Sequence, residues 1–227
     1  MEILSAHLEE INFIKENVPS WKDIPDGNIW LQRLCGISNV VYKVTTNEDV
    51  TPQAIILRKF GDTEAVVDKD KESVVFNLMA EVGRGPKCYA KSSKYRCEQF
   101  FDAAPIKTSQ INEPYWRRKL AFALAKHHSL EANEIRKDHI ILERLNETKF
   151  YETYSSKSVS EEGFTKEQFK RLTEMKVLGS REEREYVKSI TPTENIVFSH
   201  NDTLNGNILV TAKDKRIILI DYEYSYK

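Results

Sequence analysis

The chain of 227 residues has few cysteines, and Cys35, Cys88 and Cys97 are irregularly spaced. Such cysteines fit reduced thiols better than a disulfide framework or a zinc site. No apolar run approaches the roughly 18 residues that a membrane-spanning helix requires. The N-terminus carries Glu2 and Glu9 and lacks the basic-then-apolar order of a secretory signal peptide. The sequence therefore predicts a cytoplasmic protein that does not insert into a membrane.

The sequence also lacks an excess of charge of one sign. Lys and Arg together number 34 and Asp and Glu number 35, which gives a net charge of -1. Proteins that bind nucleic acid carry basic surfaces, so we expect no nucleic-acid partner. The apolar share of 40% is enough for a sizeable core, and the length allows one large domain or two small lobes.

Two stretches in which polar residues adjoin short apolar runs are the most informative part of the sequence. The first, Ser199–Val210, contains an aspartate followed five residues later by an asparagine. The second, Ile217–Tyr224, is an apolar run that leads into Asp221. Short β-branched runs beside polar loops are typical of buried strands that deliver side chains to a site.

The order Asp202, Asn207, Asp221 suits phosphoryl transfer. This chemistry needs an acceptor for the proton of the substrate hydroxyl and metal ions that clamp the nucleotide phosphates. In the protein-kinase catalytic loop an aspartate precedes a metal-binding asparagine by five positions, and a metal-binding aspartate follows later. We therefore predict that Asp202 is the base and that Asn207 and Asp221 are Mg²⁺ ligands. His200 is expected to brace the loop.

An alternative interpretation of both stretches is an ordinary β-hairpin with a turn at residues 213–215. Asp and Asn are common in turns because their side chains form local hydrogen bonds. An isolated Asp and Asn at this spacing is more often such a turn. The His-Asn that precedes Asp202 and the apolar run that ends in Asp221 favour the catalytic interpretation.

These residues resemble the paired signatures of the choline/ethanolamine kinase family. The matching residues are His-Asn-Asp at 200–202 with Gly-Asn-Ile-Leu at 206–209, and Ile-Asp-Tyr-Glu-Tyr-Ser at 220–225. The first signature is shared with aminoglycoside phosphotransferases, and the second is more specific. The resemblance implies an α+β, bilobal protein-kinase-like fold with ATP in the cleft. We expect an N-lobe of antiparallel sheet plus helix at 1–101 and a mainly helical C-lobe with small catalytic hairpins at 102–227.

The resemblance extends to the N-terminal half of the chain. The turn that contains Gly36, Ser38 and Asn39, before a predicted strand at 40–44, looks like the nucleotide loop of the family. It implies that these residues contact ATP, although the spacing alone would fit an ordinary turn. Arg58, on the strand predicted at 54–58, stands where the family has an arginine that reaches the ATP phosphates, and its guanidinium suits bidentate phosphate contact. Without the resemblance it would be a surface strand cation.

A helical pattern at 64–82 carries Glu72, which the resemblance pairs with Arg58. In kinase-like folds a helix glutamate holds the strand cation on the phosphates. The alternative is a solvated helix glutamate. The strand predicted at 95–101 looks like the hinge between the lobes. We expect adenine to meet backbone groups at or near Glu98, Gln99 and Phe100.

Helical patterns at 115–130, 145–158 and 165–190 supply the predicted C-lobe. His127 and His128 point in different directions as neighbours on a helix, so we expect structural roles for both. The chain stops at Lys227, whereas family members continue, and we therefore expect a truncated C-lobe.

The implied function is ATP- and Mg²⁺-dependent phosphorylation of the hydroxyl of choline or ethanolamine, which gives a phospho-amino-alcohol for phospholipid synthesis. Tyr224 is a candidate wall of the amine pocket because aromatic faces attract quaternary ammonium groups. An apolar Leu204 favours ethanolamine slightly. The alternatives are an aminoglycoside-phosphotransferase-like small-molecule kinase and a non-catalytic, kinase-shaped partner subunit. The sequence leaves open whether the protein is a homodimer.

Overall fold

The computed structural model describes seven stretches of the chain, residues 7–34, 39–61, 69–130, 165–167, 185–186, 189–190 and 197–225. The chain divides into two compact units, 1–127 with 200–225 and 128–199 with 226–227. The helix predicted at 145–158 and most of the one predicted at 165–190 lie outside the described residues. Nearly all the structure below belongs to the first unit.

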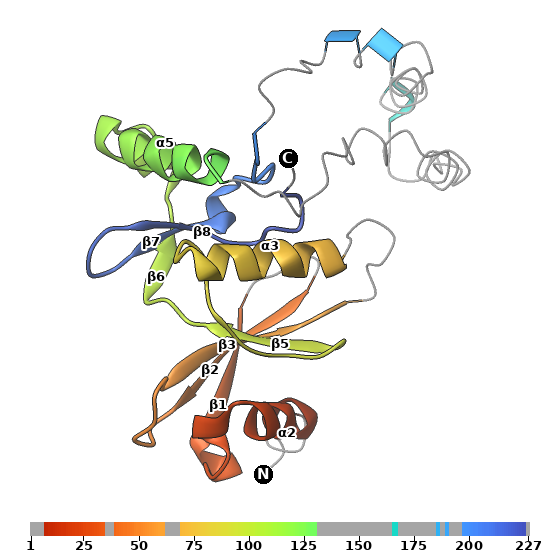
Figure 1. Cartoon of the computed structure of the whole chain (residues 1–227), viewed down its shortest axis with the longest axis vertical. Helices are drawn as coiled ribbons and strands as arrows, with labels where there is room; N and C mark the ends of the chain where they lie inside the picture. The colour runs from red at the N-terminus through yellow and green to blue at the C-terminus, as the bar shows by residue number, and fades with distance from the viewer. Residues whose placement is uncertain are drawn as a thin grey trace. The chain divides into compact units, whose positions relative to one another are not determined.

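The first unit contains a five-stranded antiparallel sheet (Figure 1) with the strand order β1-β2-β3-β5-β4. Its strands are β1 Ile29–Leu34, β2 Val40–Thr46, β3 Ala54–Lys59, β4 Cys88–Lys91 and β5 Tyr95–Gln99. The strands predicted at 40–44 and 54–58 are confirmed as β2 and β3, which are antiparallel neighbours with Val44 opposite Ile55. Strand β4 was not predicted, because its four residues show no clear alternation of apolar and polar side chains.

A hydrophobic cluster packs helix α2, Leu8–Asn17, and a short 3₁₀ turn, Pro19–Trp21, against this sheet. Ile14 and Trp21 are fully buried. The Trp21 indole also donates a hydrogen bond of 2.9 Å to the carbonyl of Pro52, which satisfies its only polar atom. Helix α2 ends at Asn17, two residues before Pro19 begins the 3₁₀ turn. A second 3₁₀ turn, Asp26–Asn28, leads into β1.

Helix α3, Lys69–Glu81, lies within the predicted range 64–82. Its buried side chains recur at helical spacing, namely Glu72, Val75, Phe76 and Met79. The helix ends where Gly83 adopts a left-handed conformation with φ of 67°. The N–H groups of Arg84 and Gly85 then donate to the Met79 carbonyl at 2.9 Å.

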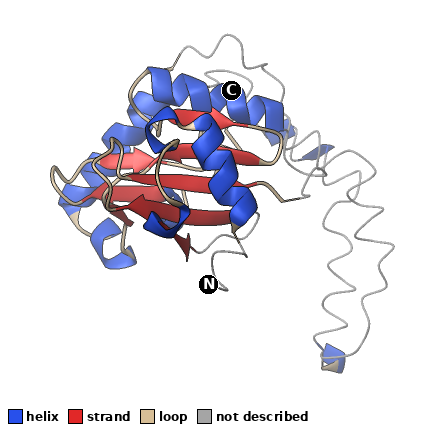
Figure 2. Ribbon diagram, turned by 90° about the horizontal axis from the view of Figure 1, so that it is seen from below, coloured by secondary structure: helices blue, strands red, loops and turns tan. Residues whose placement is uncertain are grey.

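A three-stranded sheet follows, with the order β6-β7-β8, from β6 Ala103–Pro105, β7 Ile208–Thr211 and β8 Ile217–Leu219. Strands β7 and β8 are the predicted hairpin, and β6 was not predicted. The chain thus passes from one sheet to the other at residues 100–102, and the lobe boundary predicted there stays a prediction. The strands of both sheets are the red arrows of Figure 2.

Two helices and one 3₁₀ turn accompany this second sheet, and they are α4 Thr108–Ile111, α5 Pro114–His128 and η4 Asn205–Asn207. Helix α5 matches the helix predicted at 115–130, and Trp116 and His127 are its buried residues. The α+β class is therefore confirmed. Within the part of the chain that the structure describes, every helix is too short or too polar to span a bilayer.

Candidate active site

Both ring nitrogens of His200 make contacts that hold the loop before β7. The His200 ring is buried, its Nε2 lies 3.0 Å from the Ile220 carbonyl oxygen, and its Nδ1 accepts the Asp202 backbone N–H at 3.3 Å. Burial lowers the pKa of His200, and the contact with Ile220 offsets part of that effect. A neutral ring with its proton on Nε2 satisfies both contacts, so His200 braces the loop, as the sequence predicted.

Two further hydrogen bonds join the first signature to the second. The Asn201 side-chain amide donates to the Tyr224 carbonyl at 2.9 Å, and the Ser225 hydroxyl donates to the His200 carbonyl at 3.3 Å. Asn201 has a φ of 60°, a left-handed conformation that asparagine tolerates better than most residues. The two motifs that are separate in the sequence are therefore one hydrogen-bonded unit.

The structure brings Asp202 and Asn207 into direct contact. The Asn207 amide nitrogen donates to Asp202 Oδ2 at 2.8 Å and to the Asp202 carbonyl at 3.1 Å. The backbone of Asn207 is fixed as well, because its carbonyl accepts the Ile220 N–H at 3.0 Å. Since the amide nitrogen faces Asp202, the amide oxygen is on the other side of the group and is available as a cation ligand.

Asp221 follows the end of β8 and contacts Arg58 from the other sheet. Arg58 Nη1 lies 3.5 Å from Asp221 Oδ1. Burial raises the pKa of Asp221, and the charge of Arg58 offsets part of that rise. Asp221 also has a φ of 67°, which is uncommon for a residue other than glycine. Such strained positions cluster at functional sites.

The predicted pairing of Arg58 with Glu72 is wrong as a direct contact. Arg58 Nε donates to Glu98 Oε1 at 2.8 Å, whereas Glu72 accepts two hydrogen bonds from Arg96, at 2.7 and 2.9 Å. The register of β3 and β5 places Arg96 opposite Arg58, and Arg96 takes up both carboxylate oxygens of Glu72. Burial lowers the pKa of Arg58, but the carboxylates of Glu98 and Asp221 outweigh it and the net shift is upward.

Glu98 lies on β5, within the strand predicted at 95–101. Its backbone lies inside the sheet, between Ile56 of β3 and Cys88 of β4, and its side chain is buried. The predicted adenine contact of Glu98 stays a prediction. The sequence did offer a signal for its real surroundings. Arg96 and Glu98 are two residues apart on a strand and therefore face the same side.

The remaining residues predicted to contact nucleotide or substrate are only partly described. Gly36 and Ser38 lie outside the described residues. Asn39 accepts the Gly61 N–H on its side-chain oxygen at 3.3 Å, so it closes the open end of the β2–β3 hairpin. The Gln99 N–H donates to the Lys87 carbonyl at 2.8 Å.

Two aromatic residues near the ends of these segments were also predicted to bind. The Lys43 ammonium lies over the Phe100 ring, 4.4 Å from the ring centroid. Tyr224 is half-buried. Both positions leave the predicted binding roles as proposals.

The donor set suits a Mg²⁺ ion that arrives with a nucleotide. Among the described residues, no group of three or more His, Cys, Asp or Glu side chains could hold a metal by itself. Mg²⁺ in nucleotide sites needs only one or two protein carboxylates, because phosphates and waters supply the other ligands. The Asp221 carboxylate and the Asn207 amide oxygen meet that requirement.

Sequence reasoning assigned no role to Tyr222 and Glu223, which follow Asp221. Tyr222 is buried, donates its hydroxyl to the Leu219 carbonyl, and packs its ring against those of Phe76 and His200. Tyr222 therefore packs against His200 and supports the loop at 200–207 from the protein interior. Burial, together with the charge of Asp221, raises the pKa of Glu223 to about 7.

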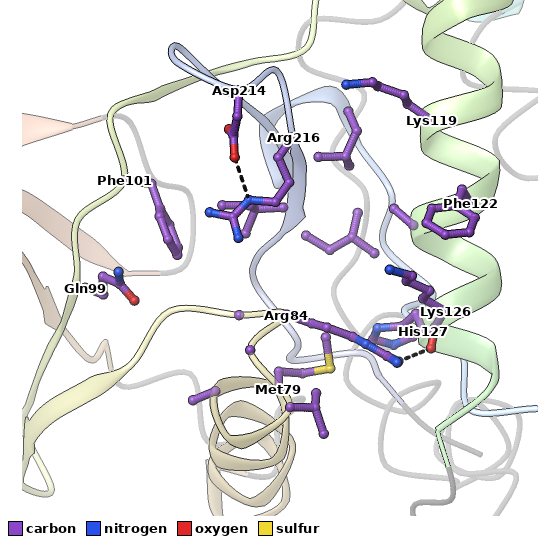
Figure 3. Close-up of a pocket in the computed structure, with 18 of the residues that line it drawn as sticks. Met79, Arg84, Gln99, Phe101, Lys119, Phe122, Lys126, His127, Asp214 and Arg216 are labelled. Atoms are coloured by element: carbon purple, nitrogen blue, oxygen red, sulfur yellow. Dashed lines mark hydrogen bonds and ion pairs between the residues drawn. The ribbon is translucent and has the colours of Figure 1, made fainter.

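A separate cavity of about 970 Å³ lies beside α5, between the turn after α3 and the β7–β8 hairpin (Figure 3). Its lining contains six cations and one carboxylate, namely Arg84, Lys87, Arg118, Lys119, Lys126, Arg216 and Asp214. Arg84 reaches across it to donate to the Lys126 carbonyl. Neither Arg58 nor the three predicted catalytic and metal-binding residues line this cavity, so it is distinct from the cluster described above.

Comparison with known proteins decides the family. The sequence profile of the choline/ethanolamine kinase family matches residues 32–227. The chain belongs to this family. The choline/ethanolamine kinase of Rattus norvegicus is 28% identical over 202 residues, which cover 84% of this chain and 49% of the rat protein. The chain thus spans about half the length of that relative.

Solved structures support the same fold. A choline kinase from Cryptosporidium parvum superposes with a TM-score of 0.70 and 26% identity, over 95% of this chain and 64% of that chain. A candidate aminoglycoside phosphotransferase from Ralstonia eutropha superposes with a TM-score of 0.57 at 16% identity, over 95% of this chain and 64% of that chain, and shows the fold alone. The bilobal protein-kinase-like fold is thereby confirmed, and the likeness to the aminoglycoside phosphotransferase is one of fold.

Proposed function

We propose that the protein transfers the γ-phosphoryl group of ATP to the hydroxyl of choline or ethanolamine, with Mg²⁺ as the metal. The observation that carries this proposal is the hydrogen-bonded unit in which Asn207 orients Asp202 and Asp221 contacts Arg58. It lies inside the segment that matches the family profile. The product, a phospho-amino-alcohol, is a head-group precursor for phospholipid synthesis.

In this proposal Asp202 is the residue that touches the alcohol. Asn207 holds Asp202 Oδ2, so the other carboxylate oxygen is oriented to accept the hydroxyl proton. The hydroxyl oxygen then bonds to the γ-phosphorus, the bond from that phosphorus to the β,γ-bridging oxygen breaks, and ADP leaves. Arg58, held by Glu98, offers its guanidinium to the phosphates. Mg²⁺ bound at Asn207 and Asp221 would supply neutralisation of the phosphate charge.

The substrate class rests on the second signature and on the relatives. The choline/ethanolamine kinase of Rattus norvegicus is named for both amino alcohols, and Tyr224 is the proposed aromatic wall for the amine. An aminoglycoside is the main alternative substrate, because the fold is shared with that class. Transfer assays with choline, ethanolamine and an aminoglycoside decide between them. Turnover of the aminoglycoside alone would contradict the amino-alcohol proposal.

Replacement of Asp202 by asparagine tests the mechanism. Asp202→Asn keeps the side-chain shape and can still accept from Asn207, but it cannot take a proton at neutral pH. We expect a loss of turnover of about a hundredfold or more, with Mg²⁺–ATP affinity and the unfolding midpoint nearly unchanged. Asp214→Asn, at an exposed carboxylate in the β7–β8 turn, is the matched control and should retain full activity. Near-normal turnover of Asp202→Asn would overturn the assignment.

A further inference from the structure

Two arginines stand directly opposite each other in the five-stranded sheet. Arg58 of β3 and Arg96 of β5 are cross-strand partners, and their exposed fractions are only 9% and 2%. Like charges at opposite positions of adjacent strands destabilise a sheet, and burial strengthens the repulsion. The pair can persist only where a carboxylate lies close to both guanidinium groups.

Glu98 supplies that carboxylate. Its Oε1 accepts from Arg58 Nε at 2.8 Å and from Arg96 Nε at 3.0 Å, so one oxygen atom bridges both arginines. Glu98 faces the same side of β5 as Arg96 because the two residues are two positions apart. The bridge fixes the direction in which each guanidinium group points.

Arg96 also binds Glu72 of helix α3, so it links Glu98 to that helix. Its two terminal nitrogens donate to the two carboxylate oxygens of Glu72 at 2.7 and 2.9 Å, which is the bidentate geometry that arginine favours. The Arg96 guanidinium also lies 3.9 Å from the centre of the Phe76 ring. Glu72, Arg96, Glu98, Arg58 and Asp221 thus form a continuous series of alternating charges, which we name the charge chain.

We propose that Arg96 and Glu98 are positioning residues for the site. They orient Arg58 toward Asp221 and transmit the position of helix α3, through Glu72, to Arg58. This inference rests on the proposed function, because the group that Arg58 would position is the phosphate of ATP. A buried ion pair is weak evidence for stability, since an apolar pair of similar volume often serves as well. Its better-attested use is to select one geometry, and the charge chain does so at the site.

Arginine Nε–H signals in the NMR spectrum test the chain without any nucleotide. In the ¹⁵N-labelled protein, the Nε–H groups of Arg58 and Arg96 should exchange slowly with water because both donate to a buried carboxylate. The variant Glu72→Gln should shift the Arg58 signal, although Glu72 makes no direct hydrogen bond to Arg58 in the structure. Glu10→Gln breaks the ion pair with Lys59, the next residue of β3, and is the matched control. It should leave the Arg58 signal unchanged.

Calorimetric titration with Mg²⁺–ATP measures the consequence for binding. We expect Glu98→Gln to weaken binding by about tenfold, Glu72→Gln to weaken it less, and Glu10→Gln to leave it unchanged. If Glu98→Gln does not fold, Glu98→Asp and Glu72→Gln replace it. A charge cluster that only stabilises the sheet would lower the unfolding midpoint without changing the affinity of the folded protein.

Two results would overturn the proposal. One is an Arg58 signal that Glu72→Gln leaves unchanged, and the other is a larger loss of affinity in Glu72→Gln than in Glu98→Gln, which would indicate direct pairing of Arg58 with Glu72. A wild-type protein that fails to bind Mg²⁺–ATP would contradict the proposed function instead. The NMR comparison would still decide whether Arg96 and Glu98 position Arg58.

Discussion

The segment 200–225 and the charge chain of the five-stranded sheet build their geometry in different ways. In the segment, side chains bond to backbone groups of the same short stretch, as His200 does with Ile220 and Asn201 with Tyr224. In the charge chain, side chains from α3, β3 and β5 meet only because two strands and a helix pack together.

Because of this difference, the residues of one region can be predicted from the sequence and the partners in the other cannot. A local motif fixes the relative positions of its residues by its own backbone, so its spacing is informative. A buried ion network depends on strand register, and a shift of one residue would exchange every partner. The sequence therefore identified Asp202, Asn207 and Asp221 as a group but assigned Arg58 the wrong direct partner.

The largest expected effect is at Asp221. Asp221→Asn removes the negative charge that a Mg²⁺ ion would meet but keeps the size of the side chain. We expect a loss of phosphoryl transfer of about a hundredfold or more and a loss of Mg²⁺-dependent ATP affinity. Stability should change by only about 1 kcal/mol, because the contact with Arg58 is long at 3.5 Å.

Steady-state kinetics and a denaturant titration on the same preparation check this prediction. Replacement of Glu98, the charge-chain member that bridges the two arginines of the sheet, should by contrast lower the stability as well. An Asp221→Asn variant with normal metal dependence would show that the second signature does not bind the metal.

The next effect is at Gly85, where the turn after α3 meets segment 200–225. A Cβ atom there would lie 2.7 Å from the Tyr222 hydroxyl and 2.9 Å from Met79 Cβ, so the packing must shift. We expect Gly85→Ala to destabilise the protein by about 1–3 kcal/mol.

Gly27→Ala is the matched control, because nothing lies within 4 Å of the Cβ that it would add. Urea denaturation of both variants measures the difference. Equal stability of the two would mean that the close contact between Gly85 and Tyr222 does not exist in solution.

The smallest effect concerns Glu10, a buried carboxylate on the side of the sheet that α2 covers. Burial raises the pKa of Glu10, but the hydrogen bond and the charge of Lys59, together with a backbone hydrogen bond, outweigh it, and the net pKa is below the ordinary value of 4.5. A lowered carboxylate pKa stabilises the folded state at higher pH, and the stabilisation is lost as the pH falls through the folded-state pKa.

We therefore expect Glu10→Gln to cost about 1–2 kcal/mol at pH 7 and progressively less as the pH falls below 4.5. Denaturant titrations at several pH values measure the trend. A cost that grows toward low pH would contradict the sign of the shift.

Much of the fold was predictable because its signals are local. The β2–β3 hairpin, α3, α5 and the β7–β8 hairpin all show their periodicity within a single stretch of sequence. Strands β4 and β6 were missed for a physical reason, since each is short and becomes a strand only through its neighbour. Pro105 of β6, for example, pairs with Leu209 of β7, far away in the sequence.

In the candidate site, too, the local contacts were predictable and the contacts that depend on strand pairing were not. Asp202, Asn207 and Asp221 could be singled out from the sequence, and their roles as base and metal ligands stay predictions. The bracing contacts of His200 were predicted as well. The bridge from Glu98 to Arg58 and Arg96 was not predictable, because Arg58 and Arg96 become neighbours only when β3 and β5 pair in their observed register. The packing role of Tyr222 was missed because its ring partners, Phe76 and His200, are distant in the sequence.

Calorimetric titration with ATP, in the presence and absence of Mg²⁺, of the wild type, Asp202→Asn and Asp221→Asn tests whether Asp221 binds the metal that accompanies the nucleotide. We expect Mg²⁺-dependent binding in the wild type and in Asp202→Asn, and a loss of that dependence in Asp221→Asn. Binding that is the same in all three proteins, or that does not require Mg²⁺, would contradict this expectation.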